Sequence, residues 1–307
     1  MIDCALIITI RRCLRAAFVF GVLALFLSAC AERADEPQAQ PPPSPAAEPP
    51  PAAEPARAAG DAETAASAAV SERSVESDQL PYGEVGTQLV YGYFAFPADM
   101  VEPLPAVVLV HEWWGLNDTV RAIAQRLAAQ GYIVLAVDLF EGRTTTDVQA
   151  ARTYMLEVLN DLDATSENIR QAIDFVKGTA GAQSVAVMGW GLGGSWALNA
   201  AMLFPDSIDA SVFYYGQVSD DPERLSAVNV PVLGFFGDND RGVPVDEVRA
   251  FESVLVDLGK EQEIIVYPGA RHGFANPDGA GFDARLAETA WERTLGFLAE
   301  VLYSDES

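Results

Sequence analysis

Hydrophobic and polar positions follow two alternating patterns between residues 87 and 302. Short apolar runs, typical of strands buried on both faces, recur between longer segments with the spacing of amphipathic helices. The predicted strands are residues 87–96 (an edge strand), 106–110, 133–137, 184–188, 210–214, 231–236 and 263–267. The predicted helices are residues 118–129, 147–160, 163–177, 194–201, 245–258 and 283–302. This alternation predicts an α/β fold with a mostly parallel sheet and helices on both faces.

Residues 1–29 follow a different pattern, which indicates an export signal. A basic segment at residues 11–15 precedes an apolar stretch at residues 16–27 that is too short to span a bilayer well. The following Leu27-Ser28-Ala29-Cys30 resembles a bacterial lipobox, which implies cleavage before Cys30 and a lipid on its sulfur. An ordinary signal peptide or an uncleaved anchor is the alternative.

The lipid would anchor the protein to the cell envelope of a bacterium, on the periplasmic or surface side. Aspartate after the lipidated cysteine often signals retention in the inner membrane of Gram-negative bacteria, and Ala31 therefore slightly favours the outer membrane. Residues 30–80 are rich in Pro, Ala and Glu, which predicts a disordered tether. Residues 81–307 remain for the folded domain.

Composition excludes some partners and some chemistry. The net charge of −25 at pH 7 argues against nucleic acid as a partner, because phosphate binding needs a basic surface. The only cysteines are Cys4, Cys13 and Cys30, all ahead of the predicted domain. We therefore expect a domain without a disulfide and without a cysteine nucleophile.

Reactive and polar residues cluster where the predicted strands end. The carboxyl ends of parallel strands meet at one edge of a sheet, and ligands bind outside that edge. The residues expected there are His111, Glu112, Trp113, Trp114, Asp138, Glu141, Arg143, Gly189 to Gly194, Tyr214, Tyr215, Asp238, Asp240, Arg241 and His272. We therefore expect the functional site at this edge.

The segment Gly189-Trp190-Gly191-Leu192-Gly193-Gly194 follows a predicted strand and opens a helix. This is the layout of the nucleophile elbow of α/β-hydrolases, with a glycine in the place of the nucleophile. The segment also satisfies the dinucleotide fingerprint G-x-G-x-x-G, which needs an acidic residue at the end of the next strand. No carboxylate stands at the end of residues 210–216, so the dinucleotide interpretation is disfavoured.

The elbow interpretation predicts an acid and then a histidine later in the chain, each after a strand. Asp240 and His272 stand in that order, and Asp238 is the competing acid. The chain has only two histidines, His111 and His272, and both follow predicted strands. We therefore expect His272 to form an acid–base pair with Asp240.

Several of these segments together resemble the dienelactone hydrolases, a branch of the α/β-hydrolases. The resemblance covers residues 82–303 and is carried by residues 110–118, 136–140, 189–194, 214–216, 237–244 and 267–276. It implies that a cysteine normally occupies the position of Gly191, that Asp240 is the acid and that His272 is the base.

The same resemblance implies roles for three neighbouring residues. Glu112 would lie beside the nucleophile, and the backbone N–H groups of Trp113 and Leu192 would form the oxyanion hole. The family opens lactones and related esters, and it needs no metal and no organic cofactor. The implied partner is therefore a small ester, lactone or carboxylate.

The glycine leaves three hypotheses open. Ser195 lies one helical turn after Gly191 and cannot easily act as the nucleophile. Water activated by His272 and Asp240 could therefore take the place of the nucleophile. The chain could instead be a pseudoenzyme that binds an ester-like or carboxylate ligand in the old pocket. The glycine could also be a recent change in a group that keeps the thiol. The pocket residues expected to contact a ligand are Trp113, Trp114, Arg143, Tyr214 and Tyr215.

Overall fold

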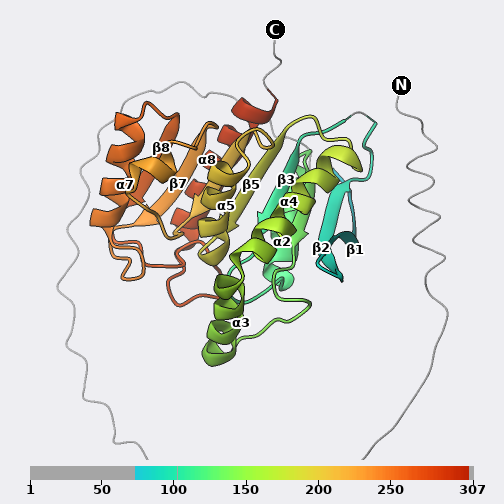
Figure 1. Cartoon of the computed structure of the whole chain (residues 1–307), viewed down its shortest axis with the longest axis horizontal. Coiled ribbons are helices and arrows are strands. Elements are labelled where there is room, and N and C mark those ends of the chain that lie inside the picture. Colours follow the sequence, from blue (N-terminus) through green and yellow to red (C-terminus); the bar gives the residue numbers. More distant parts are fainter. Residues whose placement is uncertain (1–72, 102, 304–307) are drawn as a thin grey trace, which may run out of the picture. The chain divides into compact units, whose positions relative to one another are not determined.

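The computed structural model describes residues 73–101 and 103–303. These residues form an eight-stranded sheet with helices on both sides (Figure 1). The strands are β1 (Val75–Val85), β2 (Gln88–Pro97), β3 (Ala106–Val110), β4 (Ile133–Val137), β5 (Val185–Trp190), β6 (Ala210–Tyr214), β7 (Val232–Gly237) and β8 (Gln262–Tyr267). The predicted signal peptide, Cys30 and most of the predicted tether lie outside the described residues.

The helices alternate with the strands as the sequence predicts. They are α2 (Asp118–Ala129), α3 (Val148–Asn160), α4 (Leu162–Gly178), α5 (Leu192–Leu203), α6 (Pro222–Leu225), α7 (Val245–Asp257) and α8 (Ala284–Leu302). Within the described ranges, no helix is both long enough and apolar enough to cross a membrane.

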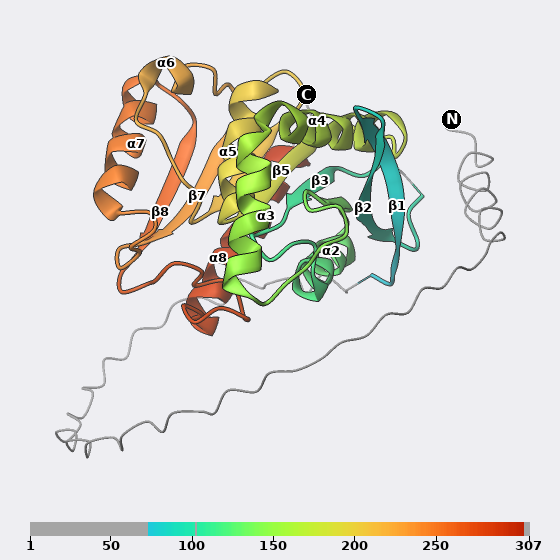
Figure 2. The ribbon, with the colours of Figure 1, turned by 60° about the horizontal axis from the view of Figure 1, so that its bottom comes forward.

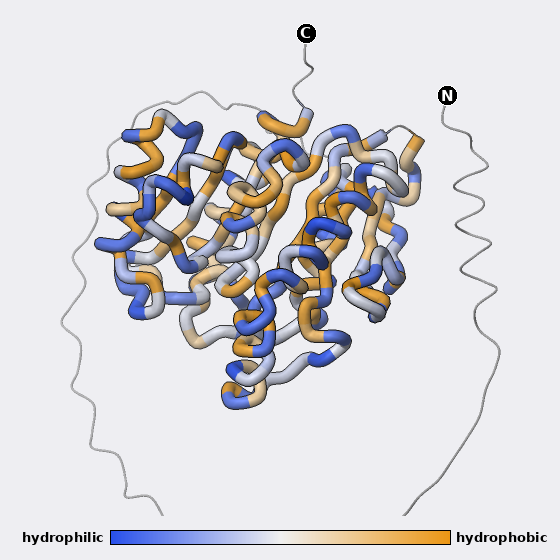
Figure 3. The backbone as a smooth tube through the Cα atoms, in the orientation of Figure 1, coloured by the Kyte–Doolittle hydropathy of each residue, from blue (hydrophilic) through white to orange (hydrophobic). Residues whose placement is uncertain are grey.

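The sheet order is β1-β2-β4-β3-β5-β6-β7-β8, and β3 to β8 run parallel. The central strands are buried on both faces, which explains their unbroken apolar sequences; Figure 3 shows apolar positions along them. One core cluster contains Val108 together with residues of α4, α5 and α7, and a second contains Val107 together with residues of α2 and α8. The predicted mostly parallel sheet with helices on both faces is confirmed.

An antiparallel hairpin closes one edge of the sheet. β1 and β2 pair from Val75 opposite Pro97 to Val85 opposite Gln88, with a register shift between Pro81 and Gly83, and β2 pairs with β4. The strand β2 was predicted as the edge, but β1 takes that place and begins ahead of the predicted domain start at residue 81.

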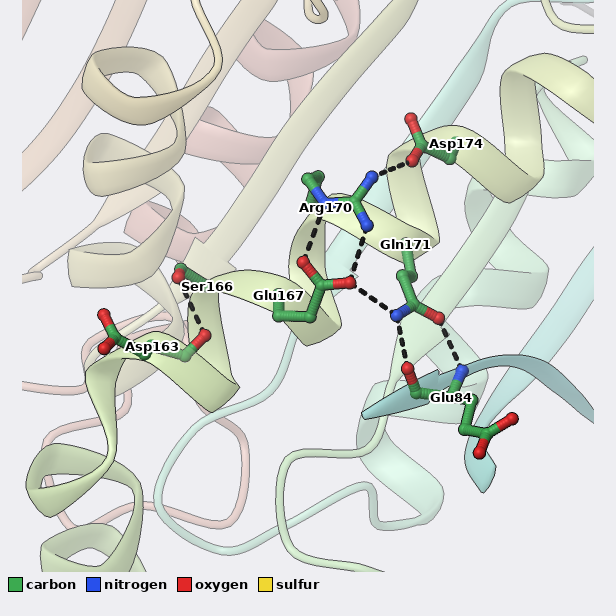
Figure 4. Close-up of polar contacts among 7 residues, drawn as sticks. All are labelled: Glu84, Asp163, Ser166, Glu167, Arg170, Gln171 and Asp174. Atoms are coloured by element: carbon green, nitrogen blue, oxygen red, sulfur yellow. Dashed lines mark hydrogen bonds and ion pairs between the residues drawn. The ribbon is translucent and has the colours of Figure 1, made fainter. Parts of the chain in front are cut away.

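A side chain of α4 helps to hold this hairpin. The Gln171 amide accepts from the backbone N–H of Glu84 and donates to the Glu84 carbonyl oxygen, as a neighbouring strand would (Figure 4). Glu167 accepts from the same amide and also pairs with Arg170, so the amide is held in place from its own helix (Figure 4).

Helix α3 projects beyond the end of the sheet in Figure 1 and lies in front of the strands in Figure 2, where this end is turned toward the viewer. Asp147 caps its first turn by accepting from the Ala150 N–H at 2.8 Å, and Asp161 accepts from Ala164 at 3.0 Å to begin α4. The two consecutive helices therefore form a corner beside the carboxyl ends of the strands, where the sequence places the functional site.

Candidate active site

The elbow forms where β5 meets α5. Gly191 is the N-cap of α5 and has φ 51° and ψ −113°, a region that residues with a side chain seldom adopt. Its N–H donates to the Tyr214 carbonyl at 2.9 Å, and its own carbonyl accepts from the Ser195 N–H at 3.0 Å. The chain thus keeps the sharp strand-to-helix turn of an elbow at a residue without a side chain.

The glycines around the elbow are required by close packing of the backbone. A Cβ atom at Gly193 would lie 2.0 Å from the Val110 carbonyl oxygen, a severe overlap. Three more glycines would place a Cβ within 2.7 Å of backbone atoms: Gly189, Gly194 and Gly216. The turn can therefore form only because these positions carry no side chain.

Gly191 differs from the neighbouring glycines, because the space where its Cβ atom would lie is open. A Cβ atom there would lie 3.9 Å from both the Glu112 Cγ and the His272 Nε2, which is ordinary contact distance. The position therefore has room for a side chain, or for a small molecule, between a carboxyl group and an imidazole.

His272 and Asp240 form the predicted pair. The His272 Nδ1 lies 2.8 Å from the Asp240 Oδ2, and the other oxygen of Asp240 accepts from the N–H groups of Gly242 at 2.7 Å and Val243 at 3.1 Å. The Asp240 side chain is fully buried, whereas half of the His272 side chain is exposed. A fixed carboxylate on Nδ1 directs Nε2 of the ring toward the open position at Gly191.

The pKa of His272 is raised by this arrangement. Burial of the ring lowers it, but the hydrogen bond to Asp240 and the charges of Asp240 and Glu112 outweigh burial. The competing acid, Asp238, instead accepts from the Gly269 N–H at 2.6 Å and caps a turn.

Glu112 is held by two donors on the opposite side of the open position. The Tyr215 hydroxyl donates to one carboxyl oxygen at 2.9 Å, and the Asn276 amide donates to the other at 2.8 Å. Burial raises the pKa of Glu112, although both hydrogen bonds and the charge of His272 lower it. Asn276 was not predicted as a site residue, and its position four residues after His272 was the available signal.

Tyr215 adopts a strained backbone to reach Glu112. Its φ is 40°, which is uncommon for a residue with a large side chain. Burial, followed by the charge of Glu112, raises the pKa of Tyr215 well above its ordinary value, so its hydroxyl stays a donor. The ring also packs edge-on against His272, with 5.1 Å between centroids.

The backbone N–H groups of Trp113 and Leu192 are free to bind a ligand, whereas the Ser195 hydroxyl is bonded to the backbone within the described residues. Trp113 and Leu192 both line the cavity, and neither backbone N–H donates a hydrogen bond within the part of the chain that is described. The Ser195 hydroxyl donates to the Gly191 carbonyl at 3.2 Å and accepts from the Gln217 N–H at 2.8 Å. Both hydrogen bonds of the Ser195 hydroxyl are therefore made to the backbone.

A cavity of about 500 Å³ opens over these groups. The predicted site residues that line it are Glu112, Trp113, Gly191, Leu192, Tyr215 and His272. Apolar residues of α3 to α5 form its far wall, among them Met155, Leu159 and Met202. Asp240 lies behind His272 and acts on the cavity only through it.

Three residues expected in the pocket lie elsewhere. Tyr214, the last residue of β6, is buried against α8, where its hydroxyl bonds Thr294, whereas Tyr215 follows the strand with a φ of 40°. Arg143 pairs with Glu157 of α3 and lies over the Tyr154 ring. Trp114 lines a small separate pocket behind Glu112.

His111 has a structural role. Its Nε2 accepts from the Leu139 N–H at 3.0 Å, and its Nδ1 therefore donates to the Glu112 carbonyl at 2.6 Å. Burial lowers the pKa of His111, which keeps the ring neutral. Within the described part of the chain, no three His, Cys, Asp or Glu side chains gather to hold a metal ion.

Comparison with known proteins gives consistent matches over this domain. The profile of the Dienelactone hydrolase family matches residues 90–302. A protein of Saccharolobus solfataricus named "Putative carboxymethylenebutenolidase" is 29% identical over 245 residues, which cover 67% of this chain and 93% of that protein. Protein usf of Aquifex pyrophilus is 30% identical over 205 residues, covering 64% of this chain and 89% of the relative.

Solved structures show the same fold. A dienelactone hydrolase-like promiscuous phosphotriesterase from metagenomic libraries has a TM-score of 0.68 at 21% identity, covering 74% of this chain and 98% of that one. An esterase of Thermogutta terrifontis has a TM-score of 0.55 at 19% identity, covering 78% of this chain and 96% of its own. At these identities the likeness concerns the fold.

Proposed function

The chain belongs to the dienelactone hydrolase family, a family of hydrolases acting on ester bonds, and from this we propose that it hydrolyses carboxylic esters or lactones with water as the nucleophile. One observation carries the proposal: the position at Gly191 is open, and it lies between Glu112 and the Nε2 of His272. A water molecule there would stand where the family has a side chain.

The reaction would proceed in two balanced steps. In the first, His272 Nε2 takes a proton from the water while the water oxygen attacks the ester carbonyl carbon. The resulting oxyanion accepts from the N–H groups of Trp113 and Leu192, which have no other partner within the described residues. In the second step the C–O bond to the leaving group breaks, and His272 returns the proton to the departing alkoxide.

The supporting residues fit these steps. Asp240 fixes the imidazole tautomer and stabilises the imidazolium that forms during attack. Each Glu112 oxygen accepts one hydrogen bond in the structure and can accept another from the water. No step requires a metal or an organic cofactor.

The alternative function is binding without turnover. The absence of a side chain at Gly191 favours it, since nucleophile loss removes most of the rate in enzymes of this kind. The cavity would then hold an ester-like ligand beside an intact His272–Asp240 pair.

A pair of aspartate variants tests the proposal. Esterase activity of the full chain on p-nitrophenyl esters is measured for wild type, Asp240→Asn and Asp238→Asn. We expect Asp240→Asn to lose at least about tenfold, because the His272 tautomer is no longer fixed. Asp238→Asn is the matched control from the same loop, whose turn-capping oxygen is kept, and it stays within about twofold of wild type.

The outcomes separate the two functions. If wild type and His272→Ala both equal buffer, water-based hydrolysis is excluded. An ester-dependent rise in the unfolding midpoint would then support the binding function.

We also propose that the protein is lipid-anchored through Cys30 in the cell envelope. The Leu27-Ser28-Ala29-Cys30 sequence supports this. Cys30→Ser should move the protein out of the membrane fraction, whereas Cys13→Ser, ahead of the cleavage position, should leave it there. Retention of Cys30→Ser in the membrane fraction would exclude the lipid anchor.

A further inference from the structure

The cavity changes character with distance from His272. Close to Gly191 it is lined by polar groups, but its far wall is made of apolar side chains from α3, α4, α5 and the loop after β6. The residues of this apolar wall are Met155, Leu159, Leu162, Leu198, Met202 and Val218. The cavity therefore offers a polar reaction end and a long apolar end.

The apolar wall follows from helical periodicity. Met155 and Leu159 are four residues apart and share one face of α3, and Leu198 and Met202 have the same relation on α5. The rise of 1.5 Å per residue places Met202 roughly 10 Å along α5 from Ser195, which lies beside the reaction end. An elongated apolar group would fit between the two helices.

Part of this apolar wall is exposed to solvent. Leu159 is 43% exposed and Leu162 is 55% exposed, although both are large hydrophobic side chains. Clustered exposed apolar surface beside a cavity is typical of ligand-binding sites. An occupant that extends from the cavity over these residues would remove their surface from water.

The charges around the cavity disfavour an anionic ligand. Glu112 and Asp240 add negative charge at the reaction end. Apart from His272, the one cation that lines the cavity among the described residues is Arg224, which is exposed and donates to Asn199 at 3.2 Å. Arg143, the cation expected from the sequence, is paired with Glu157 instead.

We propose that the substrate is a neutral ester with a medium-length unbranched alkyl or acyl chain, held between α3 and α5 with the ester carbonyl at Gly191. The inference rests on the proposed ester hydrolysis for its chemistry, but the apolar site can be tested without turnover. It predicts that a carboxylate at the far end of the chain weakens binding, because Arg224, the one cation besides His272 among the described lining residues, is exposed and already donates to Asn199.

The first experiment varies the chain on one leaving group. We compare kcat/KM of the full-length protein for p-nitrophenyl acetate, p-nitrophenyl octanoate and the mono-p-nitrophenyl ester of suberic acid, which matches octanoate in length but ends in a carboxylate. We expect octanoate to exceed acetate by roughly fourfold per methylene that becomes buried, and the suberate ester to lose most of that gain. Equal rates on acetate and octanoate would overturn the proposal while leaving ester hydrolysis intact, and so would a suberate ester as good as octanoate.

A pair of neighbouring variants locates the chain. Met202→Trp fills the cavity, whereas Leu203→Trp adds the same ring on the exposed side of α5. We expect Met202→Trp to lose the preference for octanoate over acetate, and Leu203→Trp, which lies outside the cavity lining, to keep both the preference and the wild-type kcat/KM for acetate. Retained preference in a folded Met202→Trp would overturn the proposed location.

Binding gives a readout that is independent of turnover. 1-Octanol should raise the unfolding midpoint of wild type and Leu203→Trp but not of Met202→Trp, and sodium octanoate should act more weakly. If 1-octanol binds in this way and no ester is hydrolysed, the apolar site stands and the proposed hydrolysis fails. If 1-octanol has no effect and no ester is hydrolysed, both are excluded.

Discussion

The elbow contains two kinds of glycine with opposite surroundings. At Gly189, Gly193, Gly194 and Gly216, an added Cβ would overlap backbone atoms of neighbouring segments. At Gly191, an added Cβ would meet only the Glu112 and His272 side chains, at 3.9 Å. The flanking glycines are therefore needed to form the turn. Gly191, at the tip of the turn, only lacks the side chain of a nucleophile, and the residues around it are in place. The fold maintains the geometry of the elbow independently of the chemistry at its tip.

The largest expected effect comes from a flanking glycine. Gly193→Ala should lower the free energy of unfolding by about 3 kcal/mol or more, because its Cβ would overlap the Val110 carbonyl and the backbone would have to move. Urea unfolding measures this. Gly178→Ala, where nothing lies within 4 Å, is the control and should change stability by no more than about 1 kcal/mol. Similar stability of both variants would contradict the claim that close backbone packing requires the flanking glycines.

The next effect concerns chemistry at the tip. Gly191→Cys should raise kcat for p-nitrophenyl acetate about 100-fold, roughly 2.7 kcal/mol, and show a burst of p-nitrophenol, since a thiol would enter a preformed site. Gly191→Ala has the same backbone constraint without the thiol and should show no burst. A Cys variant that stays at the wild-type rate would mean that the vacancy is not arranged for acyl transfer.

A smaller effect is the pH dependence of the wild-type rate. The base acts only when His272 is neutral, and the pKa of His272 lies above its ordinary value. The rate should therefore rise about tenfold per pH unit below that pKa and level off above it. Asp240→Asn removes the bond and the charge that raise the pKa, so its rising limb should move to lower pH. A wild-type rate that falls with rising pH would contradict the assignment of His272 as base.

The smallest effect is the backbone cost at the tip. Gly191→Ala should lower the free energy of unfolding by about 1 kcal/mol, because φ is positive while space is open. Gly142→Ala, also at positive φ with no neighbour within 4 Å, should cost a similar amount. If Gly191→Ala lowered the free energy of unfolding as much as Gly193→Ala, the space at Gly191 would not be open.

The sequence predicts the centre of the fold better than its edges. The bounds predicted for β4 and β6 agree with the structure, because strands buried on both faces are continuous apolar runs. Strand β1 was missed because Val75–Val85 is mostly exposed, carries three acidic residues, includes Pro81, and has an irregular register between Pro81 and Gly83. Its pairing with β2 is what makes it a strand. The bounds predicted for helix α2 also agree with the structure, and Asn117 is its N-cap.

The site was predictable in its chain order but not in its side-chain directions. Asp240 and His272 follow strands in the order of the elbow enzymes, which was enough to pair them. A strand-end position does not say which face a side chain joins, so Tyr214 was grouped with Tyr215 although the two diverge. The bond from Asn276 to Glu112 joins residues 164 positions apart, which no local pattern reveals.

The open tip has a consequence for how this lineage can change. Because a Cβ atom at Gly191 would meet only Glu112 and His272, both at the ordinary contact distance of 3.9 Å, one substitution could introduce or delete a nucleophile without compensating changes elsewhere in the elbow. The side chain at this position, and with it the reaction mechanism, can therefore change while the backbone of the turn is kept.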